Sequence, residues 1–253
     1  MASKIELKGK VALVTGGAKG MGASHCRLMA ERGAAVIVAD VDPAGEQLAA
    51  ELRATGADAR FVHLDVTREA DWTAVVDGAM KSHGKVDILV NNAGVVVLKN
   101  VEECTPEEFD FVFNVNIKGV FLGCKHILPA MKAAGGGSIV NISSASGLKA
   151  VMPQLSLYTA SKGAVRTFSK AVAWEYTAHN IRVNSVYPGL IETSLNAEFL
   201  KDPATRRMML GNTMFDRPGS CAEVSEAVAF LASDAASYMT GSELAVDGGW
   251  TAN

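Results

Sequence analysis

The sequence predicts an α/β protein built on a doubly wound parallel sheet of about seven strands. Short apolar runs rich in β-branched residues alternate along the chain with longer segments of helical period. The runs V-A-L-V, A-V-I-V and D-I-L-V are continuous, without alternation of apolar and polar residues. Strands buried on both faces have this pattern, because helices cover both sides of a parallel sheet. We therefore expect helices on both faces of the sheet.

The expected strands and helices follow one another in order from the start of the chain. Strands are expected at residues 11–15, 35–40, 60–64, 86–91, 138–142 and 182–186. Helix starts are indicated at Asp42-Pro43 and at Thr105-Pro106, where a capping side chain precedes a proline. Further helices are expected at residues 23–32, at 67–81 and from 158 to about 178.

Composition and charge exclude several classes of protein. The chain has 253 residues, 49% of them apolar, which suits one domain spanning residues 1–253. A formal net charge of -3 provides no basic surface for nucleic acid or an anionic membrane. The polar start lacks the apolar segment of a signal peptide, and no apolar run reaches the roughly 20 residues of a membrane helix. The four cysteines and five histidines lack metal-ligand spacing. We expect a cytoplasmic protein with no bound metal.

A glycine-rich turn follows the first expected strand and leads directly into the helix at 23–32. Its glycines, Gly16, Gly20 and Gly22, permit a tight turn and a close approach of backbone N–H groups to a pyrophosphate. Any tight strand-to-helix turn can use glycine, so this turn alone does not distinguish a dinucleotide-binding loop from an ordinary structural turn. It is a candidate cradle for a dinucleotide.

An acidic residue, Asp40, ends the second expected strand, about 20 residues after the glycine turn. A carboxylate at this distance can accept hydrogen bonds from both hydroxyls of an adenosine ribose, and it repels a 2′-phosphate. We therefore expect NAD in preference to NADP, although Lys19 could partly offset the repulsion. The alternative is a capping aspartate, a role for which Asp42 is better placed.

Tyr158 and Lys162 lie four residues apart at the start of an expected helix, so they share one face. A tyrosine with its ordinary pKa of about 10 is a poor base at neutral pH, but a nearby ammonium group favours the phenolate. Tyr158 is therefore a candidate acid/base. The alternative is an ordinary solvated lysine beside a half-buried tyrosine.

The motifs occur together in one order along the chain. The pattern T-G-x-x-x-G-x-G at 15–22 is followed by N-N-A-G at 91–94, Ser143-Ser144, Tyr158 with Lys162, and Y-P-G at 187–189. Open α/β sheets bind ligands at the carboxyl ends of their strands, where these motifs are expected. From Lys8 to Gly249 the sequence resembles the short-chain dehydrogenase/reductase family, whose fold is Rossmann-like.

The resemblance implies catalytic roles for four residues. Tyr158 is implied as the acid/base, and Lys162 as the residue that lowers its pKa and holds the nicotinamide ribose. Ser144 is implied as the group that hydrogen-bonds the substrate oxygen. Asn116 matches the fourth catalytic residue, which holds a water behind Lys162. Asn114 is the rival position, and the alternative for Asn116 is a satisfied amide inside a helix.

The resemblance also implies cofactor contacts and an assembly. Besides Gly16, Gly20, Gly22, Asp40, Tyr158 and Lys162, the implied cofactor-binding residues are Met21, Asp65, Val66, Asn92, Ala93, Gly94, Pro188, Gly189, Ile191 and Thr193. Asp65 could instead cap the helix at 67–81. The stretch Asp247-Gly248-Gly249 resembles the end of the family's C-terminal strand, often at a tetramer interface, so a homotetramer is expected.

One departure from the family affects the serine. Ser144 and Tyr158 are 14 residues apart, one more than is usual in the family, which leaves Ser143 and Ser146 as alternatives to Ser144. The run N-I-S-S-A-S-G at 141–147 aligns best with Ser144 as the catalytic hydroxyl.

A substrate lid is expected at about residues 190–217, which are rich in apolar side chains. Methionine-rich segments suit adaptable apolar pockets, but such residues can also pack a helix pair onto the sheet. Apolar residues expected in the lid are Leu195, Phe199, Met208, Met209, Leu210, Met214 and Phe215. Further candidate walls of the pocket are Val95, Val96, Leu148, Met152, Leu155 and Tyr187.

These features favour an NAD-dependent oxidoreductase that interconverts a secondary alcohol and a ketone, with an apolar, cyclic or steroid-like substrate. One alternative is a reductase of 3-oxoacyl thioesters on an acyl carrier protein, which would prefer NADPH. Another is a non-catalytic dinucleotide-binding scaffold, which would have no need for Asn116, Ser144, Tyr158 and Lys162 together.

Overall fold

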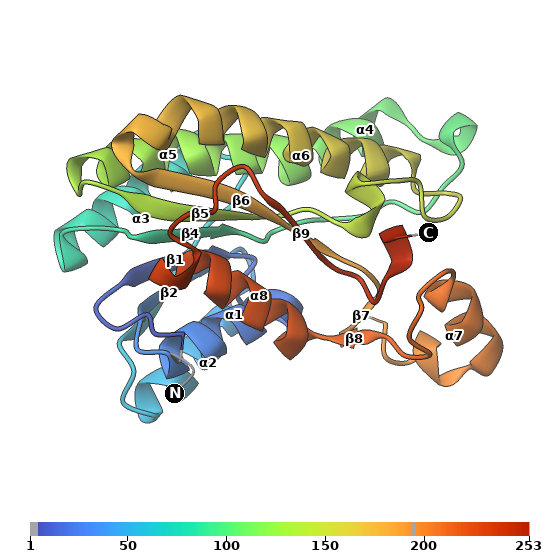
Figure 1. Ribbon diagram of the computed structural model, residues 1–253, viewed down its shortest axis with the longest axis horizontal. Coiled ribbons are helices and arrows are strands. Elements are labelled where there is room, and N and C mark those ends of the chain that lie inside the picture. Colours follow the sequence, from blue (N-terminus) through green and yellow to red (C-terminus); the bar gives the residue numbers. More distant parts are fainter. Residues whose placement is uncertain (1–4, 194–195, 253) are drawn as a thin grey trace.

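The central feature of the fold is one parallel sheet. The computed structural model describes residues 5–193 and 196–252, and in these residues seven strands are ordered β3-β2-β1-β4-β5-β6-β9 (Figure 1). The strands are β1 (Val11–Thr15), β2 (Ala35–Asp40), β3 (Ala59–His63), β4 (Ile88–Asn91), β5 (Gly137–Ile142), β6 (Ile181–Pro188) and β9 (Glu243–Val246). Because β1 pairs with both β2 and β4, the strand order reverses beside β1. The predicted doubly wound α/β fold is confirmed, and the crevice at such a reversal is where these sheets bind ligands.

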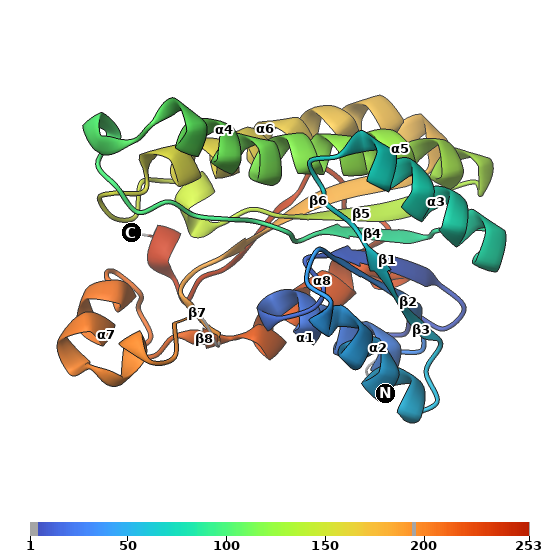
Figure 2. The same cartoon turned by 180° about the vertical axis from the view of Figure 1, so that it is seen from behind.

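Helices cover both faces of the sheet (Figures 1 and 2). One layer contains α3 (Glu69–His83), α4 (Pro106–Phe113), α5 (Gly119–Ala133) and α6 (Ser156–Tyr176), and the other contains α1 (Gly20–Glu31), α2 (Ala44–Ala54) and α8 (Cys221–Ala232). A π-helix, Asn114–Lys118, joins α4 to α5. Among the described helices, none is both long enough and apolar enough to cross a membrane.

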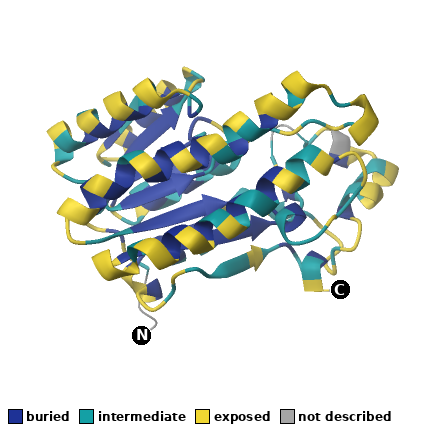
Figure 3. Ribbon diagram, turned by 90° about the horizontal axis from the view of Figure 1, so that it is seen from above, coloured by how far each residue is buried: buried dark blue, intermediate teal, exposed yellow. Residues whose placement is uncertain are grey.

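Each helix layer forms its own apolar core against the sheet. Leu13 and Ile37 face the core shared with Trp72 of α3, while Val14 faces the core shared with Met29 of α1. The central strands are accordingly buried, the edge strands β3 and β9 are mostly of intermediate burial, and the outer surfaces of the helices are exposed (Figure 3). Adjacent residues of one strand therefore support opposite helix layers, which is the reason for the continuous apolar runs in the sequence.

The structure adds elements that the sequence pattern did not predict. Two short strands, β7 (Ile191–Glu192) and β8 (Gly219–Ser220), pair in parallel as a separate small sheet. The segment between them contains α7 (Pro203–Leu210), which lies apart from the two helix layers (Figure 1). The predicted lid segment therefore begins and ends close to this strand pair. Its residue Leu195 lies outside the described residues.

Two predicted helix starts have different outcomes. Thr105 caps α4, since its side chain accepts a hydrogen bond from the Glu108 N–H, as predicted. The helix expected from residue 67 begins instead at Glu69, because Asp65 Oδ1 accepts from the Thr67 N–H at 2.9 Å and holds a turn before the helix.

Candidate active site

The glycine-rich turn between β1 and α1 depends on the absence of side chains at three positions. Gly16 and Gly20 have positive φ angles of 61° and 54°, which disfavour residues with a side chain. A Cβ atom on Gly22 would lie 2.0 Å from the Gly16 carbonyl oxygen. The turn therefore packs its backbone against the start of α1, whose N-terminus favours a negatively charged ligand.

Hydrogen bonds tie this turn to the end of β4. Thr15 Oγ1 accepts from the N–H groups of Asn92 at 3.0 Å and Ala93 at 3.1 Å. In return, Asn92 Nδ2 donates to the carbonyl oxygens of Thr15 at 2.9 Å and Gly16 at 3.1 Å. The two sides of the crevice beside β1 are thus held at a fixed separation.

Asp40 joins the end of β2 to the same turn. Its Oδ2 accepts from the Ala18 N–H at 2.9 Å, and its Oδ1 accepts from the Asp42 N–H at 3.0 Å. Each carboxylate oxygen has a further lone pair, so Asp40 can still accept hydrogen bonds from ribose hydroxyls. Lys19 Nζ lies 2.5 Å from Asp42 Oδ2, and this pairing holds the pKa of Asp42 below its ordinary value. Asp42 also accepts from the Ala44 N–H at 2.9 Å, which closes a turn just before α2; the N-cap of α2 is Pro43, so the predicted capping role of Asp42 was wrong.

A cavity of about 1060 Å³ lies along this edge of the sheet and collects most of the predicted cofactor-binding residues. It is lined by Gly16, Gly20, Met21, Gly22, Asp40, Asp65, Val66, Asn92, Ala93, Gly94 and Thr193. We call it the nucleotide cavity. It extends from Asp40 on β2 to Thr193 beyond β7, so it crosses the point where the strand order reverses.

A second cavity of about 640 Å³ contains three of the four predicted catalytic side chains, and Asn116 does not line it. We call it the catalytic cavity. Of the predicted residues, it is lined by Ser144, Tyr158, Lys162, Pro188, Gly189 and Ile191. The two cavities adjoin, because Met21, Asn92, Gly94, Val95, Phe111 and Thr193 line both.

Tyr158, Ser144 and Lys162 converge from two elements. Tyr158 and Lys162 lie one turn apart on α6, and Ser144 follows β5 and hydrogen-bonds the Tyr158 phenol. Lys162 is 3% exposed, and its Nζ donates to the Ile142 carbonyl oxygen at 2.9 Å. The last residue of β5 therefore fixes the ammonium group beside the tyrosine.

The pKa of Tyr158 differs from the sequence-based expectation. Burial raises the pKa of the Tyr158 phenol above its ordinary value, and the hydrogen bond with Ser144 opposes this shift. Burial also lowers the pKa of Lys162, to about 8. The expected lowering of the Tyr158 pKa by Lys162 is thus not seen, because the desolvation of the phenol outweighs the stabilising contacts.

The three candidate serines occupy different environments. Ser143 Oγ donates to the Lys162 carbonyl oxygen at 2.9 Å, so it fastens the end of β5 to α6. Ser146 donates its backbone N–H to Ser144 Oγ at 3.1 Å. Ser144 has the side chain that contacts Tyr158.

Asn116 lies behind the catalytic cavity, in the π-helix between α4 and α5, and it is completely buried. Its Oδ1 accepts from the Val95 N–H at 2.8 Å, and its Nδ2 donates to the Val95 carbonyl oxygen and to Ser161 Oγ. Because the side-chain amide is engaged in this way, a water held by Asn116 would have to bind its backbone carbonyl. Asn114, the rival position, is exposed and lines the nucleotide cavity.

The walls of the catalytic cavity are mainly apolar. Of the predicted wall residues, Val95, Val96, Met152, Leu155 and Met209 line it. The prediction was wrong for Leu148 and Tyr187, which lie outside the cavity; Tyr187 is fully buried in β6. Sequence reasoning missed Phe111, Asn196 and Trp250. Asn196 follows Thr193 at the spacing of a capping box, in which the fourth residue's side chain accepts from the first residue's backbone N–H, and this spacing could have indicated it.

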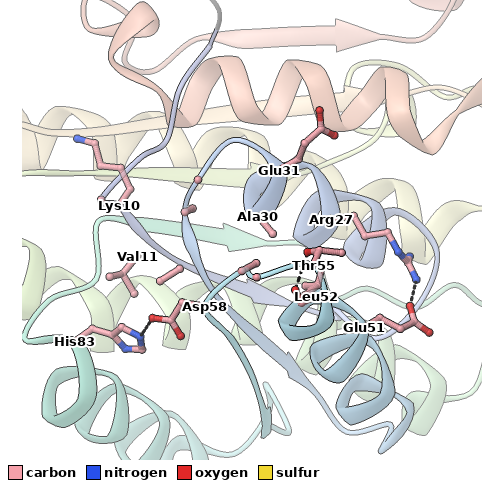
Figure 4. A pocket seen from close by; sticks show the side chains of 16 residues that line it. Lys10, Val11, Arg27, Ala30, Glu31, Glu51, Leu52, Thr55, Asp58 and His83 are labelled. Carbon is pink, nitrogen blue, oxygen red and sulfur yellow. Dashed lines mark hydrogen bonds and ion pairs between the residues drawn. The ribbon is translucent and has the colours of Figure 1, made fainter.

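A separate hollow of about 980 Å³ lies at the amino ends of β1 and β2 (Figure 4). Two pairs of its charged side chains contact each other: Arg27 with Glu51 at 2.9 Å, and His83 with Asp58 at 3.2 Å. This hollow is at the opposite end of the strands from Tyr158 and Asp40, so it does not belong to the candidate active site.

Known proteins resemble the chain over nearly its whole length. A family model described as enoyl-(acyl carrier protein) reductase matches residues 16–251. Cyclopentanol dehydrogenase from Comamonas testosteroni is 49% identical, covering 96% of this chain and 98% of the relative. A 3-alpha-(or 20-beta)-hydroxysteroid dehydrogenase from Mycobacterium tuberculosis is 46% identical, covering 97% of this chain and 91% of the relative.

A solved structure extends the comparison to the fold. The crystal structure of a gluconate 5-dehydrogenase from Burkholderia cenocepacia, in complex with NADP and tartrate, is 34% identical to the chain, with a TM-score of 0.93 and coverage of 98% of both chains. With the glycine turn, the serine and the Tyr158–Lys162 pair at one edge of the same sheet, these matches show that the chain belongs to the short-chain dehydrogenase/reductase family, whose members use NAD or NADP.

Proposed function

We propose that the protein is an NAD-dependent dehydrogenase that interconverts an apolar, cyclic secondary alcohol and its ketone. The observation that carries this proposal is the contact between Ser144 and Tyr158 in an apolar cavity that adjoins the nucleotide cavity. A hydroxyl pair of this kind suits an alcohol oxygen, which both donates and accepts hydrogen bonds. A bound nicotinamide dinucleotide supplies the ring that accepts or donates hydride.

In the oxidative direction, Tyr158 takes the proton from the substrate hydroxyl while Ser144 donates a hydrogen bond to the same oxygen. The two side chains thereby orient the alcohol and stabilise the negative charge that develops on its oxygen. In the reductive direction, Tyr158 returns the proton to the ketone oxygen.

Lys162 and Asn116 act on this step from behind the tyrosine. The Lys162 ammonium favours the Tyr158 phenolate and holds the nicotinamide ribose. Asn116 and Lys162 both lie beside Gly94, since a Cβ atom on this glycine would be 3.3 Å from Lys162 Nζ and 3.4 Å from Asn116 Oδ1. A water bound to the Asn116 carbonyl would pass protons from the lysine toward solvent.

Asp40 supports a preference for NAD over NADP. Asp40 and Lys19 both line the nucleotide cavity, and the Lys19 ammonium group is already paired with the Asp42 carboxylate. A 2′-phosphate beside these groups would meet a net negative charge.

The lining of the catalytic cavity supports an apolar substrate. Its volume of about 640 Å³ lies within the usual range for sites that bind small molecules. We infer that residues 190–217 form the lid, since Leu190, Asn196 and Met209 from this segment line the cavity. The two relatives are named for cyclopentanol and for hydroxysteroids, which are both cyclic secondary alcohols.

A substrate panel tests the proposed function. Reduction of NAD would be followed by absorbance with cyclopentanol, cyclohexanol, a 3-hydroxysteroid and the charged acyclic alcohol gluconate. We expect the cyclic apolar alcohols to be oxidised faster than gluconate. Faster turnover of gluconate, or faster reduction of a 3-oxoacyl thioester with NADPH, would overturn the proposal. No turnover of any substrate would favour a dinucleotide-binding scaffold.

We also infer a homotetramer in the cytoplasm. Two large aromatic side chains on the outer surface of α5 and α6, Phe121 and Trp174, are 45% and 89% exposed, which supports a contact with another copy. All four cysteines are free thiols, in keeping with a reducing compartment. The mass of the protein in solution tests the assembly: we expect four chains, reduced in number by Trp174→Glu. A monomeric wild-type protein would contradict the inference.

A further inference from the structure

Asn196 connects two backbone positions in the segment that follows β7. Its Oδ1 accepts from the Thr193 N–H at 2.8 Å and from Thr193 Oγ1 at 3.4 Å. Its Nδ2 donates to the Ile191 carbonyl oxygen at 2.9 Å. Both ends of the amide are therefore used, and together they hold residues 191–193 in one conformation.

The residues held in this way lie where the two cavities meet. Thr193 lines both the nucleotide cavity and the catalytic cavity, while Ile191 and Asn196 line the catalytic cavity. A dinucleotide bound in the nucleotide cavity has to extend past Thr193 to bring its nicotinamide near Tyr158. Thr193 is thus placed to contact the substituent of the nicotinamide ring.

The contact with Asn196 also determines what Thr193 can bind. A hydroxyl group has one hydrogen to donate and two lone pairs that accept. When the Thr193 hydroxyl donates its hydrogen to Asn196 Oδ1, 3.4 Å away, its oxygen is left as an acceptor. An acceptor selects a ligand that has an N–H group to donate, such as a primary carboxamide, over a ligand that has a carboxylate.

We propose that Asn196 is a positioning residue that presents Thr193 as a hydrogen-bond acceptor to the nicotinamide carboxamide. This inference depends on the proposed use of a nicotinamide cofactor. Asn196 does not take part in the proton transfer; it acts through Thr193 and Ile191. Its effect should therefore be confined to the nicotinamide end of the cofactor.

A comparison of NADH with ADP-ribose distinguishes a role of Asn196 at the nicotinamide end from a general effect of the substitution on folding. NADH and ADP-ribose contain the same pyrophosphate and adenosine, but ADP-ribose lacks the nicotinamide. We expect Asn196→Leu to weaken NADH binding about tenfold, the effect of losing roughly one or two hydrogen bonds, and to change ADP-ribose binding less than about twofold. Asn196→Asp keeps an acceptor for Thr193, so it should lose less NADH affinity than the leucine variant.

The control is Glu198→Gln in the same segment, an exposed side chain that pairs with Lys201 and should leave both affinities unchanged. A parallel loss of NADH and ADP-ribose binding in Asn196→Leu would overturn the inference, as would an unchanged affinity for both. Either of these results can occur while the wild-type protein still oxidises alcohols with NAD. Failure of this inference is therefore distinguishable from failure of the proposed function.

A measurement on the wild-type protein is independent of how any variant folds. Nicotinic acid adenine dinucleotide has a carboxylate in place of the carboxamide. We expect it to bind at least about tenfold more weakly than NAD, because the carboxylate would face the lone pairs of Thr193. Equal affinity for the two dinucleotides would overturn the inference.

Discussion

The ammonium nitrogen of Lys162 lies 5.7 Å from the centre of the Tyr158 ring. At this distance a positive charge favours the phenolate electrostatically, even though the burial of the phenol acts in the opposite direction. The lysine is held there by the Ile142 carbonyl, and burial lowers its own pKa to about 8. The acid/base strength that we propose for Tyr158 therefore depends on a charge that is itself sensitive to pH above neutrality.

Removal of the Lys162 charge should shift alcohol oxidation to higher pH. In Lys162→Met the phenolate loses its neighbouring cation, so the pH of half-maximal kcat should rise by about one pH unit or more. The measurement is kcat against pH at saturating cofactor, with Lys162→Arg as a charge-retaining comparison. An unchanged profile in the methionine variant would contradict the assigned role.

Loss of the Tyr158 hydroxyl should abolish proton transfer without abolishing cofactor binding. We expect Tyr158→Phe to lower kcat by about 10²-fold to 10⁴-fold, the usual contribution of a positioned acid/base, while NADH still binds. Tyr176→Phe at the other end of α6 is the matched control and should retain normal turnover. Near-normal turnover of Tyr158→Phe would rule out this residue as the acid/base.

The carboxylate of Asp40 should control the choice between NAD and NADP. Asp40→Ser removes the charge that repels a 2′-phosphate, so the ratio of kcat/KM for NAD over NADP should fall by about tenfold or more. Adding Asp42→Asn releases Lys19 from its ion pair and should lower the ratio further. If neither change moves the ratio, another group sets the preference.

A single added methyl group at Gly22 should disrupt the cradle. The new Cβ would lie 2.0 Å from the Gly16 carbonyl oxygen and 2.7 Å from Asn92 Nδ2. We expect Gly22→Ala to lower the free energy of unfolding by about 1–3 kcal/mol and to weaken NADH binding. In Gly78→Ala, on α3, the added atom meets nothing within 4 Å, and stability should rise by about 0.5–1 kcal/mol. Equal stability of the two variants would contradict the packing described for the turn.

Acid should destabilise the protein through His25, a residue of α1 whose side chain contacts α8. The ring is 1% exposed, its Nδ1 lies 2.8 Å from Ser225 Oγ, and burial lowers its pKa to about 4. As the pH falls below about 6.5, the unfolded chain gains a proton that the folded protein does not bind until about pH 4. The stability present above pH 6.5 is therefore lost progressively toward pH 4, by about 2 kcal/mol at pH 5.

Urea unfolding at pH 7 and pH 5 measures this loss. In His25→Asn the buried group does not titrate, so the decrease in unfolding free energy between the two pH values should be smaller than in the wild-type protein. Carboxylate titrations are common to both proteins and cancel in the comparison. Identical decreases would show that His25 does not contribute.

The fold was predictable because its signals are local. The apolar runs marked the strands through β6, and glycine, proline and capping residues marked the turns. The pair β7–β8 was missed because two-residue strands have no periodicity for a pattern to detect. The start of α3 was misplaced because Asp65 closes a turn with Thr67 instead of capping the helix.

The placement of candidate site residues in the cavities was predictable where a motif fixes both residue type and position, as for Gly22 and Tyr158. It was less predictable where a role depends on contacts made in three dimensions. The sequence favoured Ser144 and left Ser143 and Ser146 as alternatives, and the different partners of the three serines separate them in the structure. Asn196 and Trp250 approach the catalytic cavity only through the path of the chain after β6.

The parallel pairing of β7 with β8 has an evolutionary consequence. Because Ile191 pairs with Gly219, the chain leaves the body of the protein and returns to it at neighbouring points. A loop whose ends are fixed side by side tolerates insertions and deletions at a small entropic cost. Descendants of this chain could therefore replace the segment between the two strands as a cassette, and so acquire new substrates while inheriting the catalytic side chains unchanged.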